Sequence, residues 1–334
     1  MSLSRKQFLK LMGGTAAAFT FSGVVLQGCK KAIERAAART PVIWIQAQSC
    51  SGCSVSLLNT VDPDIASLVT EHISLNFHQT LMGATGHVAI KVLEEAVKKN
   101  RNDFVLVVEG SIPTGADEFC TIGEIDGHHV GARTWITELG KRAKAIIAVG
   151  SCATFGGIPA AQPRDGSGNP TGAKALKDIL PGKTIVNIPG CPPHPDWMAG
   201  TILHFILRGV PELDEYNRPK MFFGKTVHEQ CEHLVDYKRG RFAQHWGEPG
   251  CLYLLGCLGM DTGCDIPKRK WLGVNSCTGS GSGCIGCTEP PFPDFGNRGI
   301  YKHLTASADQ IQQIDNEQIR SAVIKLRDGG VIHG

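Results

Sequence analysis

The chain has 334 residues, of which 42% are hydrophobic and 7% aromatic, with forty glycines and thirteen cysteines. This length is enough for two domains. Residues 1–40 carry seven basic residues and one acidic residue, which leaves 27 basic and 30 acidic residues and a net charge of −3 for the rest. No basic stripe interleaved with aromatic residues occurs, so this composition argues against nucleic acid as a partner.

An export signal is predicted at residues 1–40. The basic segment 4–10 precedes the moderately apolar stretch 11–26 and resembles a twin-arginine signal, with Lys6 in place of the usual second arginine. We therefore expect a periplasmic protein that is exported folded by the Tat route. The alternatives are a membrane anchor formed by the same stretch and a lipid anchor at Cys29. The sequence contains no other run of transmembrane length.

The first domain is predicted to span residues 41–210, where apolar runs alternate with helical patterns. Strands are expected at 41–46, 72–77, 103–108, 145–149 and 184–188, and helices at 54–70, 87–98, 131–142, 173–179 and 195–208. This alternation predicts an α/β fold with a doubly wound parallel sheet in the flavodoxin-like strand order. Two glycine-rich loops, 109–127 and 156–172, are long enough to suggest contact surfaces.

Four cysteines directly follow the ends of three of these predicted strands. Cys50 and Cys53 form a Cys-Ser-Gly-Cys pair after the first strand, Cys152 follows the fourth, and Cys191 follows the fifth. The carboxyl ends of parallel strands share one edge of the sheet, which is where ligands bind in open α/β folds. Four thiolates that converge at this edge could hold one metal cluster.

The second domain, residues 211–334, shows no clear apolar periodicity and is rich in glycine, proline and cysteine. We expect an irregular iron–sulfur domain, mostly short helices and loops, that gains stability from metal sites. Its candidate ligands are His228, Cys231, Cys251, Cys257, Cys264, Cys277, Cys284 and Cys287. His228 and Cys231 are three residues apart and would share one face of a helical turn.

The number of cysteines also favours clusters. Cys29 lies in the predicted signal and Cys120 stands alone in a loop, so eleven cysteines remain and His228 completes twelve ligands. Twelve ligands are three sets of four, which is what three cubane iron–sulfur clusters require. Zinc, bound by a Cys3His set that includes His228, and disulfides stay open as alternatives. The odd number of thiols argues against a complete disulfide framework.

Several motifs together resemble the small, electron-transfer subunit of nickel–iron hydrogenases, over nearly the whole chain. They are Cys50-Ser-Gly-Cys53-Ser, Glu109-Gly-Ser-Ile-Pro-Thr114, Gly150-Ser-Cys-Ala-Thr-Phe-Gly-Gly157, Pro189-Gly-Cys-Pro-Pro-His-Pro-Asp196, His228-Glu-Gln-Cys231 and Cys284-Ile-Gly-Cys287-Thr-Glu-Pro. The resemblance implies an enzyme that oxidises or produces hydrogen as a heterodimer. The Ni-Fe centre would lie in the hydrogenase large subunit, and no residue of this chain would be catalytic.

The resemblance also implies which ligands share a cluster. Cys50, Cys53, Cys152 and Cys191 would hold a proximal 4Fe-4S cluster, and His228, Cys231, Cys251 and Cys257 a distal 4Fe-4S cluster. Cys264, Cys284 and Cys287 would hold a medial cluster. Many relatives have a proline near position 277 and a 3Fe-4S medial cluster, whereas Cys277 can supply a fourth thiolate here. We therefore predict a 4Fe-4S medial cluster, as in the nickel–iron–selenium branch, with 3Fe-4S as the alternative.

The expected external acceptor is a multihaem c-type cytochrome, because this partner is common among periplasmic members and the slightly acidic body suits a basic partner. No C-terminal anchor is evident, and peripheral membrane association stays open. Two rival functions are a quinone-reductase-type subunit, related through the first domain only, and a stand-alone iron–sulfur electron carrier.

Overall fold

The computed structural model of the chain describes residues 39–294 apart from 101 and 163–166, together with residues 317, 320, 321 and 324. Residues 1–38 of the predicted export signal, including Cys29, lie outside the described residues. From Thr40 onward the chain forms one compact unit, and the predicted domain boundary at residue 210 stays a prediction. Within the described part of the chain, no helix has the length and apolar character needed to cross a membrane.

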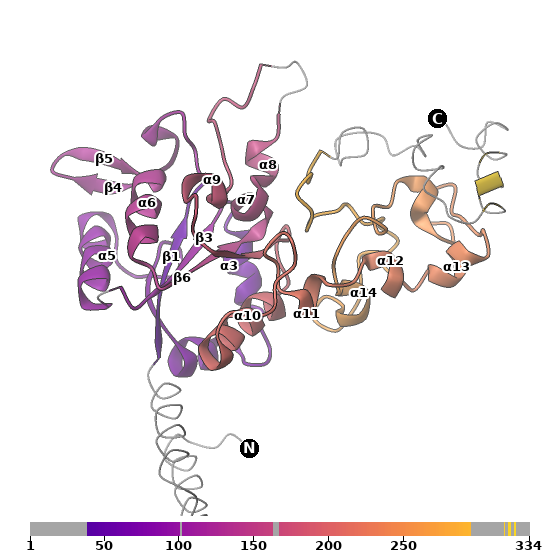
Figure 1. Ribbon diagram of the computed structural model, residues 1–334, viewed down its shortest axis with the longest axis horizontal. Helices are drawn as coiled ribbons and strands as arrows, with labels where there is room; N and C mark the ends of the chain where they lie inside the picture. Colours follow the sequence, from indigo (N-terminus) through magenta and orange to yellow (C-terminus); the bar gives the residue numbers. More distant parts are fainter. Residues whose placement is uncertain are drawn as a thin grey trace, which may run out of the picture. The chain divides into compact units, whose positions relative to one another are not determined.

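A five-stranded parallel sheet forms the centre of the fold, in the order β2-β1-β3-β6-β7 (Figure 1). Its strands are β1 Thr40–Gln46, β2 Ile73–His78, β3 Val105–Glu109, β6 Ala145–Val149 and β7 Ile185–Ile188. When the parallel strands are numbered along the chain, this order is 2-1-3-4-5. The prediction of a flavodoxin-like doubly wound sheet is therefore confirmed.

Both faces of the sheet are covered, so its strands are apolar on both sides. On one face Trp44 and Val107 pack against Leu57 of α3 (Gly52–Leu57) and Trp197 of α10 (Pro195–Arg208). On the other face, alternate strand residues such as Ile45 pack against α5 (Gly86–Asn100) and α6 (Ala132–Arg142). Burial on both faces explains why the strands appear in the sequence as continuous apolar runs.

The helix predicted at 54–70 is wrong as a single element. The chain leaves α3 after Leu57, passes Pro63, and then forms α4 (Ile65–Ser67) and a π-helical turn, η2 (Leu68–His72). Proline has no backbone N–H to donate and clashes with the preceding helical turn, which accounts for the break. The helix predicted at 173–179 is shorter than expected, because α9 covers only Leu176–Ile179.

The loop predicted at 109–127 contains regular structure that sequence reasoning missed. A 3-10 turn, η3 (Asp117–Cys120), leads into β4 (Thr121–Ile125), which pairs in antiparallel fashion with β5 (His128–Gly131). Asp126 and Gly127 join the two strands with φ values of 50° and 78°. An Asp-Gly pair between two apolar-containing runs is a standard hairpin signal and could have revealed it.

The later part of the described chain consists of short helices and loops, as expected. After α7 (Gly150–Phe155), α8 (Gly157–Ala160) and α10, the elements are α11 Lys220–Phe223, α12 Val227–Gln230, α13 Leu234–Lys238, η4 Leu252–Leu255 and α14 Ile266–Arg269. Small apolar clusters occur there, such as one built on Tyr237, Tyr253 and Leu254, while Phe222, Phe223, Val227 and Ile266 join the large cluster that also contains Trp44 and Trp197. Such short elements cannot be stable by themselves, so this region depends on contacts between segments.

Packing of α5 on the sheet gives the first testable prediction. Leu93 is fully buried, whereas Val88 on the same helix is 50% exposed. Leu93→Ala should lower the free energy of unfolding by about 2–5 kcal/mol because it removes buried methyl groups and leaves a cavity. Val88→Ala should change it by less than about 0.5 kcal/mol. Urea unfolding of the purified protein, followed by tryptophan fluorescence, measures both; equal effects would contradict this packing.

Candidate metal centres

The first site lies at the carboxyl edge of the sheet and contains the four predicted thiols. Cys50 precedes and Cys53 lies within α3 after β1, Cys152 lies in α7 after β6, and Cys191 follows β7. Cys53 is close enough to the other three for their charges to act on it. Burial, and then the charges of Glu109 and the neighbouring thiols, raise the pKa of Cys53 well above its ordinary value.

A glycine at the end of β6 permits this convergence. Gly150 has φ of 84°, and a Cβ added at this position would lie 2.5 Å from the Cys53 sulfur. Only glycine combines a left-handed backbone with so close an approach. Burial also raises the pKa of Cys152, to about 12. A buried thiol with a raised pKa keeps its proton until a metal replaces it.

Glu109 at the end of β3 organises the start of α3. Its buried carboxylate accepts hydrogen bonds from Trp44 Nε1 at 3.1 Å, Gln46 Nε2 at 3.2 Å and Ser54 Oγ at 2.5 Å. It also accepts from the backbone N–H of Cys53 at 3.2 Å. One carboxylate therefore fixes the loop that carries Cys50 and Cys53 to two neighbouring strands. Sequence analysis placed Glu109 only in a family motif, without these contacts.

The second site is a cavity in the later part of the chain whose walls include all four predicted distal ligands, His228, Cys231, Cys251 and Cys257. His228 lies in α12, whose start is fixed by a capping box between Thr226 and Glu229. Partial burial lowers the pKa of His228 and so favours the neutral imidazole that binds metals. The Tyr237 ring meets the imidazole edge-on, with the centroids 4.5 Å apart.

The third site is a cavity of about 120 Å³ whose walls include all four predicted medial ligands, Cys264, Cys277, Cys284 and Cys287. Trp197 and Trp271 also line this cavity, whose surface is mostly apolar. Burial raises the pKa of Cys284 and also that of Cys287, the latter to about 12. Cys277 differs from the other three because it is exposed.

The three sites follow one another in space. Pro192, the chain neighbour of Cys191 in the first site, lines the third cavity, and Cys191 is close enough to influence the pKa of Cys287. Val227 and Thr278 line both the second and the third cavities. The third site therefore lies between the other two, which matches the names proximal, medial and distal.

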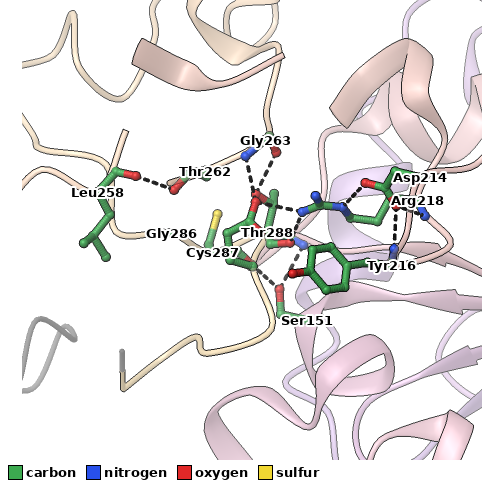
Figure 2. A network of polar contacts seen from close by, with 12 residues as sticks. Ser151, Asp214, Tyr216, Arg218, Leu258, Thr262, Gly263, Gly286, Cys287 and Thr288 are labelled. Atoms are coloured by element: carbon green, nitrogen blue, oxygen red, sulfur yellow. Dashed lines mark hydrogen bonds and ion pairs between the residues drawn. The ribbon is translucent and has the colours of Figure 1, made fainter. Parts of the chain in front are cut away.

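A buried ion pair holds the third site together (Figure 2). The Arg218 guanidinium donates to Glu289 Oε1 at 2.7 Å, to Asp214 Oδ2 at 2.7 Å and to the carbonyl oxygen of Thr288 at 2.9 Å. Glu289 Oε1 also accepts from the backbone N–H of Gly263 at 2.7 Å. The two chain segments that carry Cys264 and Cys287 are thus joined through one carboxylate.

A hydroxyl connects this network to the first site. The Ser151 Oγ donates to the carbonyl oxygen of Cys287 and accepts from the backbone N–H of Gly190 at 2.9 Å. Ser151 precedes Cys152 and Gly190 precedes Cys191, so one side chain connects ligand-bearing segments of two sites. Neither Ser151 nor Arg218 was found by sequence reasoning, which considered only metal-binding side chains.

The donors of the three sites have the chemistry that iron–sulfur clusters require. All cysteines within residues 39–294 are free thiols. Among the described residues, no three His, Cys, Asp or Glu side chains form a group that could hold one metal ion. Each thiolate of a cubane binds a different iron atom, so its sulfurs need not meet at one point. The donor sets fit such a cluster in number and in type. Cys120, in contrast, packs against the sheet core away from the three sets.

Comparison with known proteins finds two matching families along the chain. Residues 50–205 match the family described as NADH ubiquinone oxidoreductase, 20 Kd subunit. Residues 223–298 match the family described as the C-terminal part of the NiFe/NiFeSe hydrogenase small subunit. The first match covers the strand-end site, and the second covers the eight candidate ligands of the two cavities.

Relatives and solved structures match across both parts. The chain is 42% identical to the periplasmic [NiFeSe] hydrogenase small subunit of Desulfomicrobium baculatum, over 88% of this chain and 97% of the relative. It is 37% identical to the periplasmic [NiFe] hydrogenase small subunit 1 of Nitratidesulfovibrio vulgaris, over 87% and 91%. A crystal structure of the reduced, active Ni-Fe-Se hydrogenase from Desulfomicrobium baculatum matches with a TM-score of 0.72 and 43% identity, over 77% of this chain and 97% of that one.

The ion pair gives the second testable prediction. Arg218 and Glu289 are 6% and 8% exposed. Glu289→Ala removes one of the two carboxylates that pair with the buried Arg218 guanidinium and leaves the backbone N–H of Gly263 without its acceptor, and should cost about 3 kcal/mol of folding free energy. The exposed Lys220–Glu212 pair, also 2.7 Å apart, is the matched control, and Glu212→Ala should leave the unfolding midpoint unchanged. Urea unfolding of both variants decides; a Glu289→Ala variant as stable as the control would refute this role.

Proposed function

This chain belongs to the NiFe/NiFeSe hydrogenase small-subunit family and is the electron-transfer partner of a hydrogenase large subunit; we propose that three 4Fe-4S clusters carry its electrons. The observation that supports this most directly is the grouping of ligands. Each predicted set of four donors lies at one place, the strand-end edge or one of the two cavities, and the three places adjoin one another.

Such clusters, when bound, accept and release single electrons. The chain sets the reduction potentials of these clusters through the ligand type, hydrogen bonds to sulfur and burial. His228 supplies a neutral ligand in place of a thiolate, which raises the potential of the distal site.

The edge that carries the proximal site is proposed to face the large subunit, which holds the Ni-Fe centre. Cys50 and Cys191 are exposed at this edge. Around it, Val55 and Leu58 are 55% and 40% exposed, and Leu81 after β2 is 40% exposed. Apolar side chains beside an exposed metal site are expected where a partner covers both.

We also propose export to the periplasm by the Tat route, with a multihaem c-type cytochrome as acceptor at the distal site. The support is the sequence of residues 1–40 and the net charge of −3 for the rest of the chain. The relatives named above are periplasmic by name. Peripheral membrane association belongs to the same proposal. The quinone-reductase-type alternative is not favoured, since it does not require the ligands of the two cavities. A stand-alone carrier is not favoured either, because the relatives are hydrogenase subunits.

Replacement of Cys277 tests the medial assignment. Cys277→Pro should remove one thiolate, so that the air-oxidised protein loses one iron per chain and gains the electron paramagnetic resonance (EPR) signal of a 3Fe-4S cluster. Cys120→Ser is the control, because Cys120 lies outside the three sets, and it should leave both the iron content and the spectrum unchanged. A 3Fe signal in the unmodified protein, or none in Cys277→Pro, would show that Cys277 is not a ligand.

Substitution at the proximal edge tests the assembly. Val55→Arg places a charge at the proposed interface and should reduce recovery of the large subunit with a tagged small subunit by about tenfold or more. Val88→Arg, on the opposite side of the sheet and equally exposed at 50%, should not. Mass spectrometry of the co-purified chains gives the ratio. Isolation of the unmodified chain alone, with its iron and without a partner, would contradict the proposal.

A further inference from the structure

One carboxylate lies between the second and third sites and is not among the predicted ligands. Glu232 directly follows Cys231 of the distal set. Its two oxygens accept hydrogen bonds from the hydroxyls of Ser276 and Thr278, the latter at 2.9 Å. These two residues are the chain neighbours of Cys277, so the carboxylate holds both sides of the fourth medial thiol.

The segment around Cys277 also closes on itself, because the Cys277 carbonyl oxygen accepts from the backbone N–H of Ser282 at 3.2 Å and from Ser280 Oγ at 2.7 Å. Ser276 Oγ also accepts from the backbone N–H of Gly279 at 2.7 Å, and the Thr278 carbonyl oxygen lies 3.3 Å from the His233 ring. Ser276 and Thr278 are 3% and 2% exposed, whereas Cys277 between them is exposed. The two anchored neighbours therefore determine where this exposed thiol lies.

The position of the carboxylate is also restricted by its surroundings. A Cβ at Gly279 would collide with Glu232 and would lie 2.5 Å from Asn275 Oδ1, so glycine leaves the room that the carboxylate occupies. Among the described residues, no lysine, arginine or histidine forms an ion pair with Glu232. An ionised carboxylate can only accept hydrogen bonds, and here it accepts them from two hydroxyls of the same short segment, 276–278.

We propose that Glu232 is a positioning residue: it holds Ser276 and Thr278 so that Cys277 stays at the medial cavity and the medial site keeps four irons. This inference rests on the proposed function and adds a residue outside its ligand sets. Thr278 lines both cavities, so the same contact also fixes the wall between the medial and distal sites. Without it, the exposed Cys277 is the ligand most easily lost on oxidation.

Two substitutions of Glu232, made in the purified heterodimer, distinguish the loss of its hydrogen bonds from the loss of its negative charge. Glu232→Ala removes both acceptors and should convert the medial site on air oxidation, with the loss of one iron per chain and a 3Fe-4S EPR signal. Glu232→Gln keeps an oxygen acceptor and an amide that can donate to a hydroxyl oxygen, so it should keep the four-iron form. Its medial and distal midpoint potentials, measured by EPR redox titration, should both rise because a negative charge has been removed.

Glu248→Ala is the matched control. Glu248 is an exposed carboxylate in the same region that accepts from the backbone N–H groups of Gln244 and His245 at 2.8 and 3.0 Å. It contacts no residue of the medial set, and its removal should leave the medial spectrum unchanged. A 3Fe signal in Glu248→Ala as strong as in Glu232→Ala would mean general loosening and would overturn the positioning role.

The outcomes distinguish this inference from the function on which it rests. A four-iron medial site in both the unmodified protein and Glu232→Ala overturns the role of Glu232 alone. A 3Fe medial site in the unmodified protein overturns the Cys277 assignment and this inference together. An iron-free unmodified protein overturns the proposed function. Conversion in Glu232→Ala, with rescue in Glu232→Gln, supports the inference.

Discussion

The buried pair of Arg218 and Glu289 is the contact on which the later half of the fold depends. In the described residues this half has only short helices, which are not stable by themselves, so its shape also depends on polar contacts between segments. The pair brings together segments about seventy residues apart, and the Ser151 hydroxyl adds the edge of the sheet (Figure 2). A buried ion pair is costly unless its hydrogen bonds are satisfied, and here the Thr288 carbonyl, Asp214 and the Gly263 N–H satisfy them.

The same logic applies to the metal-binding side chains. Most of the described thiols are buried or half-buried, and their raised pKa values mean that the free chain keeps protons which metal binding must displace. Carboxylates such as Glu109 and Glu232 are not among the proposed ligands, but each holds the backbone of a segment that carries one. Some side chains of this protein would therefore bind the metal, while others, such as Glu109 and Glu232, hold the metal-binding segments in place.

The sequence predicted the parts of this structure that rest on local pattern. Apolar runs located the strands, and the position of Cys152 and Cys191 after strand ends placed them correctly at one edge of the sheet. The helix at 54–70 was wrong because the effect of Pro63 was not weighed, and the β4–β5 hairpin was missed although Asp126-Gly127 signals it. The grouping of the later cysteines came from family resemblance alone. Contacts such as Arg218 with Glu289 join residues far apart in the chain, and no local pattern marks them.

The central claim is that twelve side chains hold three four-iron clusters in a row between a large subunit and the surface. Mössbauer spectroscopy of the iron-57-enriched heterodimer, recorded after air oxidation and after reduction by hydrogen, tests it most directly. We expect all the iron of this chain to belong to 4Fe-4S clusters in both states, and one third of it to respond to replacement of His228 by Cys. A 3Fe-4S component in the unmodified protein, or iron outside clusters beyond that of the Ni-Fe centre in the large subunit, would contradict it.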